Sequence, residues 1–207
     1  PRTHAFLYLL PNPRKACLIM DKVRIGVIGC GGMARNHMQC FANVENLEFT
    51  AAADPFEASR KTVEETYNVK TFEDGYEMLD SGLIDAVFIG TPHYFHPPYA
   101  IAAFERGLHV LTEKPLAVTA KAAQEMIDAA DRNPKLAFAV MFQNRALPIW
   151  REAKRLIETG ELGTIQRSAW IITTWFRTQS YYDSGSWRAT WKGEGGGVLL
   201  NQCPHQL

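Results

Sequence analysis

Short apolar runs alternate with amphipathic stretches along the chain between residues 22 and 142. Residues 85–90 (DAVFIG) are apolar through their middle, which is typical of a strand covered on both faces of a parallel sheet. In residues 119–132, apolar side chains recur at positions i, i+3, i+4 and i+7, which predicts one buried helix face with Thr119 as the N-cap. The pattern therefore predicts strands that alternate with helices.

The predicted strands lie at residues 22–28, 47–53, 69–72, 85–90, 108–112 and 136–142. The predicted helices lie between them, at residues 33–43, 56–67, 74–81, 95–106 and 119–132. Strands and helices that alternate at this spacing form right-handed βαβ units. We therefore expect an α/β fold with a doubly wound parallel sheet.

The alternation ends after residue 142. A helix is expected at residues 148–159, followed by a β-rich run at 164–178 and a loop rich in Gly and Trp that reaches residue 200. We therefore assign residues 20–142 to a first domain and residues 143–207 to the start of a second, incomplete domain.

The first 19 residues contain three prolines and show no helical or strand period. The apolar patch at residues 5–10 is too short for a secretory signal, and no small-residue cleavage site follows it. We expect Met20 to be the natural start, residues 1–19 to be an extension foreign to the protein, and the chain to be a fragment.

The charge balance limits the classes of partner. The chain has 22 basic and 22 acidic side chains and no basic run, so a nucleic-acid partner is not expected. The apolar stretches fall short of the roughly 18 residues that a spanning helix needs, so no membrane partner is expected either. The four cysteines show no CxxC spacing, so neither a disulfide framework nor a metal site is expected. A cytoplasmic location is expected.

A glycine-rich turn follows the first predicted strand and has the form G-x-G-x-x-A. The first glycine permits a tight turn, the second permits close approach of a pyrophosphate, and the final small residue permits close packing of helix and strand. The candidate cofactor-binding residues of this turn are Gly29, Gly31, Gly32, Met33 and Ala34.

Asp54 closes the second predicted strand 20 residues after Ala34, where a carboxylate can accept hydrogen bonds from an adenosine ribose. The alternative is a helix N-cap before Pro55. A carboxylate at this position repels a 2′-phosphate, so NAD is favoured over NADP as the cofactor.

Further candidates follow the fourth and fifth strands, because ligands bind at the carboxyl ends of the strands of an open parallel sheet. Thr91, Pro92 and His96 follow the fourth strand as candidate cofactor-binding residues, and the pair His93 and His96 lacks the additional ligands that a metal site needs. Glu113 and Lys114 follow the fifth strand. The alternative there is a surface Glu/Lys pair in a turn before Pro115, which disfavours the helical conformation for Lys114.

Together these motifs resemble the Gfo/Idh/MocA family, the glucose-fructose oxidoreductase and inositol dehydrogenase type of NAD(P)-dependent oxidoreductase. The later part of the chain is similar to the family's G-G-G-x-x-x-D-x-x-x-H element, at Gly195, Gly196 and Gly197 followed by Asn201 and His205. Asn201 departs from the Asp that is commoner in the family. An amide cannot act as the base that takes a proton from a substrate, so Asn201 is expected to orient the substrate or His205.

The resemblance implies a Rossmann domain followed by an α/β domain with an open, mainly antiparallel sheet that supports a homo-oligomer. It implies hydride transfer between nicotinamide and a sugar or polyol carbon, with Lys114 and His205 as the catalytic residues. Lys114, Asn201 and His205 are then also substrate-binding residues. Trp187 and Arg188 are two further candidate substrate-binding residues, because an aromatic face and a guanidinium group suit a polyol. The alternative for His205 is a capping or packed histidine.

Two further functions remain open from the sequence. One is an NAD-dependent, redox-assisted glycosidase of the same family, and the other is a non-catalytic NAD-binding sensor. The presence of both Lys114 and His205 argues against the sensor. For the fragment itself we expect little or no turnover.

Overall fold

The computed structural model describes residues 22–171, 173, 176–183, 185 and 187–205. The segment 1–19, interpreted above as an extension, lies outside the described residues.

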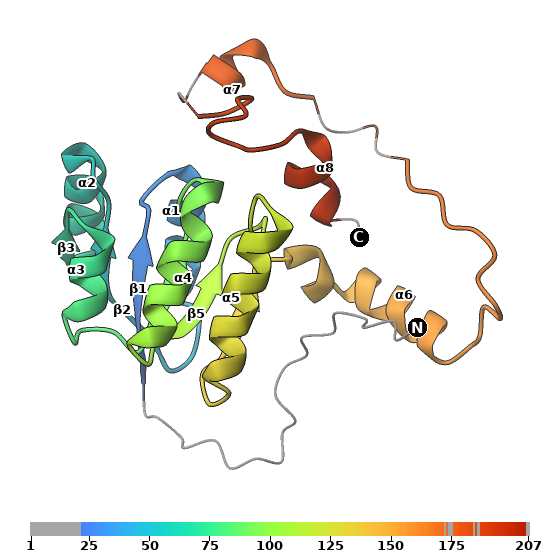
Figure 1. Ribbon diagram of the computed structural model, residues 1–207, viewed down its shortest axis with the longest axis horizontal. Coiled ribbons are helices and arrows are strands. Elements are labelled where there is room, and N and C mark those ends of the chain that lie inside the picture. The colour runs from blue at the N-terminus through green and yellow to red at the C-terminus, as the bar shows by residue number, and fades with distance from the viewer. Residues whose placement is uncertain (1–21, 172, 174–175, 184, 186, 206–207) are drawn as a thin grey trace.

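A six-stranded parallel sheet forms the first part of the chain (Figure 1). Its order is β3-β2-β1-β4-β5-β6, and every neighbouring pair is parallel. This is the strand order of the doubly wound dinucleotide-binding fold, so the predicted Rossmann sheet is confirmed. The strands are β1 (Val23–Ile28), β2 (Leu47–Ala53), β3 (Lys70–Phe72), β4 (Ala86–Ile89), β5 (His109–Thr112) and β6 (Phe138–Val140).

Five α-helices connect these strands, as the periodicity predicts, and one short 3-10 turn precedes the fourth helix. Thr119 caps the fifth helix, because its hydroxyl accepts a hydrogen bond from the N–H of Ala122 at 3.2 Å. The elements are α1 (Gly32–Phe41), α2 (Glu57–Tyr67), α3 (Gly75–Asp80), η1 (His93–Phe95), α4 (His96–Glu105) and α5 (Ala120–Arg132).

The helices cover both faces of the sheet with separate apolar cores. One core joins the sheet to α3, α4 and α5, and the other joins it to α1 and α2. The middle of β4 contributes to both, since Val87 and Ile89 belong to the first core and Phe88 to the second. The continuous apolar run of this strand reflects burial on both sides.

The second part of the chain consists of short helices joined by extended segments. These are η2 (Gln143–Ala146), α6 (Pro148–Glu158), α7 (Gln179–Asp183), α8 (Val198–Asn201) and η3 (Cys203–His205). The predicted β-rich run at 164–178 is not confirmed, because its described residues form no strand. A β-rich sequence becomes a strand only when a neighbouring strand takes up its hydrogen bonds, and the described residues of the second part supply none.

The end of the chain returns to the carboxyl edge of the sheet, where α8 lies close to the loop that follows β5 (Figure 1). Asn201 ends α8, and His205 lies in the following 3-10 turn, so the two residues do not share one helix face. Pro204 favours the end of α8 here, because it lacks the N–H that would continue the α-helical bonding. None of the described helices is long and apolar enough to cross a membrane.

Candidate functional site

The turn between β1 and α1 has the backbone that a dinucleotide-binding loop requires. Gly29 adopts φ +89°, and a Cβ at this position would lie 2.9 Å from the backbone of Gly90, so only glycine fits. A Cβ on Gly90 would in turn lie 2.9 Å from the Cβ of Ala34. The small residues of the turn therefore let the loops after β1 and β4 pack closely.

Gly31 and Gly32 face open space at the N-terminus of α1. Among the residues that the structure describes, no heavy atom lies within 4 Å of a Cβ built on either glycine, and no side chain caps the helix. The free N–H groups of a helix N-terminus attract an anion. Met33, in the first turn of α1, is half exposed. This space fits the pyrophosphate of a dinucleotide.

Asp54 follows β2 and is 7% exposed. One carboxylate oxygen accepts the N–H of Cys30 at 2.7 Å, and the other accepts the N–H of Phe56 at 2.9 Å. Asp54 thus holds the glycine turn and the chain just before α2. The N-cap alternative is wrong for Asp54, because Phe56 is the N-cap residue of α2 and no side chain of the described residues caps this helix. A carboxylate has about four acceptor positions, so two remain for ribose hydroxyls.

The loop after β4 is built around buried histidines. His96 is fully buried, and its ring nitrogens face the carbonyl oxygens of Pro115 at 2.8 Å and Thr91 at 2.9 Å. The contacts hold Thr91 and Pro92 beside the glycine turn and join the loops after β4 and β5. The hydroxyl of Thr91 is buried without a hydrogen-bond partner among the described residues.

The end of β5 carries two charged side chains with different surroundings. Glu113 is buried and accepts hydrogen bonds from His37 at 2.8 Å and from the N–H of Lys114 at 3.1 Å. The peptide bond between Lys114 and Pro115 is cis. The surface-pair alternative does not describe Glu113, because its carboxylate lies inside the site.

Lys114 joins the sheet to the end of the chain. Its Nζ donates to the side-chain oxygen of Asn201 at 2.7 Å and to the backbone oxygen of Asn201 at 2.9 Å. Burial is the main cause of the lowered pKa of Lys114, and the guanidiniums of Arg177 and Arg188 lower it further. An ammonium has three N–H donors, so one remains for a bound molecule.

His205 lies within electrostatic reach of Lys114. Burial lowers the pKa of His205, and the charge of Lys114 lowers it further, while Glu113 acts in the opposite direction. The Nδ1 of His205 is buried and has no hydrogen-bond partner among the described residues. A histidine that favours its neutral form near pH 7 can accept a proton.

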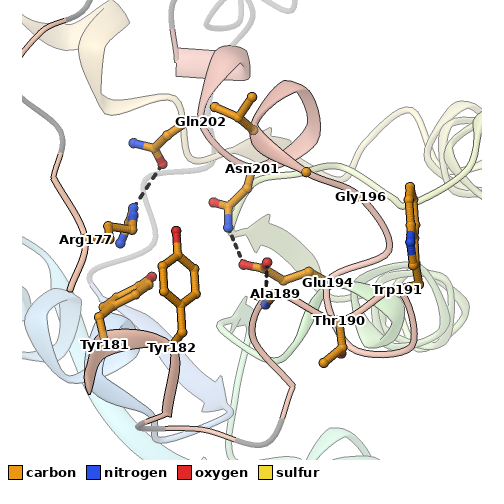
Figure 2. Close-up of a pocket in the computed structure, with 12 residues that line it drawn as sticks. Arg177, Tyr181, Tyr182, Ala189, Thr190, Trp191, Glu194, Gly196, Asn201 and Gln202 are labelled. Atoms are coloured by element: carbon orange, nitrogen blue, oxygen red, sulfur yellow. Dashed lines mark hydrogen bonds between the residues drawn. The ribbon is translucent and has the colours of Figure 1, made fainter. Parts of the chain in front are cut away.

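A cavity of about 320 Å³ lies between α7, α8 and the loop that joins them (Figure 2). Aromatic and polar side chains line it, including Arg177, Tyr181, Tyr182, Trp191, Glu194 and Asn201. Such a lining suits a ligand with hydroxyl groups, because aromatic faces and hydrogen-bonding groups are combined.

Trp187 and Arg188 lie next to this cavity but do not line it. The Trp187 ring packs edge-on against His93, with ring centroids 5.2 Å apart. Arg188 stacks over the rings of Trp187 and Tyr181 and donates to the Tyr181 hydroxyl. Arg188 therefore contacts the wall of the cavity through Tyr181, whereas Trp187 contacts Arg188 and His93.

The structure adds residues that the sequence reasoning did not select. Glu194 is buried beside Asn201, His37 holds Glu113, and Arg177 lines the cavity. The sequence signal that could have indicated Glu194 is its position directly before the three glycines. His37 and Arg177 carry no local pattern that separates them from other helix and loop residues.

Two family models match the chain. The model described as "Oxidoreductase family, NAD-binding Rossmann fold" matches residues 23–142, and the model described as "GFO/IDH/MocA C-terminal domain" matches residues 150–207. The first match alone covers more than half of the chain.

Individual relatives agree with the family models. The rhizopine catabolism protein MocA of Rhizobium meliloti is 30% identical over 188 residues, which cover 91% of this chain and 56% of MocA.

Solved structures of the same kind also match. The WlbA dehydrogenase from Bordetella pertussis, in complex with NADH and UDP-GlcNAcA, matches with a TM-score of 0.81 and 30% identity, covering 89% of this chain and 53% of that one. The scyllo-inositol dehydrogenase from Lactobacillus casei, with bound NAD(H) and scyllo-inositol, matches with a TM-score of 0.66 and 28% identity, covering 69% and 42%. The chain thus spans about half the length of these relatives. The chain belongs to the Gfo/Idh/MocA family of oxidoreductases.

Proposed function

We propose that this chain is the nucleotide-binding part and the beginning of the substrate-binding part of an NAD-dependent sugar or polyol dehydrogenase. The observation that carries the proposal is the contact between Lys114 and Asn201, which brings the end of β5 to the segment that holds His205. A hydride-transfer site of this family needs the cofactor edge of the sheet and an acid/base group in one place.

The cofactor is proposed to lie across the carboxyl ends of β1, β2 and β4. Gly31 and Gly32 would hold the pyrophosphate, and Asp54 the adenosine ribose, with Thr91 and Pro92 along the opposite loop. The negative charge of Asp54 favours NAD over NADP, because a 2′-phosphate would lie against a carboxylate. A hollow beside Asp54, lined by Pro55, Tyr76 and Tyr99 among others, offers an aromatic surface for the adenine.

Lys114 and His205 are proposed to act on the substrate hydroxyl. The free N–H of Lys114 donates to the reacting oxygen and stabilises negative charge that develops on it. Neutral His205 accepts the hydroxyl proton during oxidation and returns it during reduction. When bound, the nicotinamide supplies the acceptor or donor of the hydride. Asn201 holds Lys114 in place and takes no proton.

The substrate class is proposed from the cavity and from the relatives. Two of the relatives with solved structures hold UDP-GlcNAcA with NADH and scyllo-inositol with NAD(H), respectively. The aromatic and amide lining of the cavity at α7 and α8 fits a ligand of this kind. We further propose that residues 143–207 begin a domain whose open, mainly antiparallel sheet supports a homo-oligomer, in a cytoplasmic protein with reduced cysteines.

The cofactor proposal is tested by titrating the chain with NADH and with NADPH and following the fluorescence of the reduced nicotinamide. We expect NADH to bind more tightly than NADPH. Gly31→Ala should abolish NADH binding without unfolding the protein, because its φ of −68° suits alanine and its Cβ would enter the open space. Equal affinities for NADH and NADPH would contradict the role given to Asp54.

The reaction is tested on the protein in its natural full length with a panel of sugars and polyols. We expect net formation of NADH, and we expect Lys114→Ala to lose turnover while it keeps NADH binding. Turnover of a nitrophenyl glycoside without net NADH formation would instead indicate the redox-assisted glycosidase.

A further inference from the structure

Glu194 is a buried carboxylate whose two oxygens are both engaged. It is 6% exposed, one oxygen accepts the side-chain N–H of Asn201, and the other accepts the N–H of Ala189 at 2.9 Å. Its backbone oxygen accepts a hydrogen bond from His93 at 2.8 Å. A carboxylate is costly to bury unless hydrogen bonds compensate it, and these contacts provide them.

The side-chain amide of Asn201 lies between a group that only accepts and a group that only donates. The carboxylate of Glu194 accepts from its nitrogen, and the ammonium of Lys114 donates to its oxygen (Figure 2 shows the first contact). Reversing the amide would place NH₂ against the ammonium and oxygen against the carboxylate. Glu194 therefore fixes the orientation in which Asn201 accepts from Lys114.

Glu194 also opposes the positive charges around Lys114. Arg177 and Arg188 lower the pKa of Lys114, whereas Glu113 and Glu194 raise it. His93, His96 and His205 face the same ammonium, and its charge lowers the pKa of each of them. Burial favours the neutral form of Lys114, and the two carboxylates oppose this effect by favouring the charged form.

We propose that Glu194 is a positioning residue of the site, which orients the Asn201 amide and through it holds the Lys114 ammonium in place. The role of this ammonium in the reaction rests on the proposed function. The contacts among Glu194, Asn201 and Lys114 do not depend on it. We expect one negative charge to be tolerated at position 194 or at position 201, and two to destabilise the fold, because adjacent buried carboxylates repel each other.

The test uses the 207-residue chain and compares wild type, Glu194→Gln, Asn201→Asp and the double variant. Competitive acetylation followed by mass spectrometry measures the reactivity of Lys114 across pH, with the exposed lysines as internal standards. Glu194→Gln should raise Lys114 labelling at pH 8 by roughly three- to ten-fold, because loss of one nearby negative charge favours the neutral amine. The double variant should return labelling to the wild-type value or below it.

Thermal unfolding gives a second measurement of the interaction between Glu194, Asn201 and Lys114. Asn201→Asp alone should lower the unfolding temperature, and adding Glu194→Gln to it should restore the unfolding temperature. Glu158→Gln, on the exposed surface of α6, is the matched control and should change neither labelling nor unfolding.

Unchanged Lys114 labelling in a folded Glu194→Gln protein would overturn the inference. If that variant does not fold, a folded double variant with wild-type labelling supports the inference, and a double variant that also fails to fold overturns it. NADH binding is measured in parallel. The expected labelling pattern without NADH binding would contradict the proposed function and leave the positioning role of Glu194 intact.

Discussion

Lys114 is a cation in a partly buried position with two guanidiniums in electrostatic reach. Its state affects His205, whose pKa is lowered by burial and, to a smaller degree, by the charge of Lys114. The charge state of Lys114 therefore influences the pKa of His205. When Lys114 is charged, His205 favours the neutral form that accepts a proton.

This coupling predicts the effect of Lys114→Met on His205. Without the ammonium, the pKa of His205 should rise, but burial should still keep it below its ordinary value. An NMR titration of the histidine ring protons measures this shift in the chain as it stands. Lys121→Met, which removes an exposed lysine on α5, is the control. A pKa of His205 that is unchanged in Lys114→Met would show that the two groups do not interact.

Local sequence signals located most of the candidate site residues before the structure. Gly29, Asp54 and Lys114 follow the strands at which a doubly wound sheet binds ligands. Glu194 and His37 were missed because their roles come from contacts between distant segments, namely Glu194 with His93 and His37 with Glu113. No local period or turn residue records such contacts.

The three glycines before α8 differ in how strictly the structure requires glycine at each position. Gly195 adopts φ +74°, and a Cβ on it would overlap the side chain of Val118. A Cβ on Gly197 would meet no heavy atom within 4 Å. The first glycine thus lets the end of the chain pack against the loop after β5, whereas the third has no such constraint.

The difference predicts unequal costs for alanine at the two positions. Gly195→Ala should destabilise the protein by about 1–3 kcal/mol, because it combines an unfavourable φ with a steric overlap. Gly197→Ala should stay within about 0.5 kcal/mol of wild type. Denaturant unfolding followed by tryptophan fluorescence measures both, since Trp187 and Trp191 lie in the adjoining loop. Equal costs would contradict the packing of Gly195 on Val118.

The helices and strands of the Rossmann sheet were predictable because each segment carries a local signal, either a periodic pattern or, as in β4, a continuous apolar run. The strand β2 and the helix α5 begin and end within one residue of their predicted bounds. The run at 164–178 was not predictable in the same way. It is rich in residues that favour strands, but a strand forms only if another segment pairs with it.

Buried histidines link the stability of the folded protein to pH. Burial is the main cause of the lowered pKa of His93, His96 and His205, so all three favour the neutral form in the folded protein. In the unfolded chain a histidine titrates near pH 6.5. Between that pH and the lower folded values, the unfolded state binds more protons, and stability falls as the pH falls.

We therefore expect the midpoint of urea unfolding to be lower at pH 5.5 than at pH 7.5. The carboxylates with lowered pKa, such as Asp85 beside Arg24, keep their charge in this range and do not oppose the effect. Proton uptake on unfolding at pH 6, measured in weakly buffered solution, gives an independent check. A midpoint that rises on acidification would contradict the burial of neutral histidines.

The contact between Lys114 and Asn201 joins residues 87 positions apart, and it has a consequence for synthesis on the ribosome. The last strand of the sheet ends at Val140, whereas η3 ends at His205. At roughly 5–20 residues per second, the ribosome needs about 3–13 s to add the intervening segment. The glycine turn and Asp54 can therefore be in place before His205 exists, so that a nascent chain gains the proposed nucleotide-binding surface seconds before the proposed acid/base group.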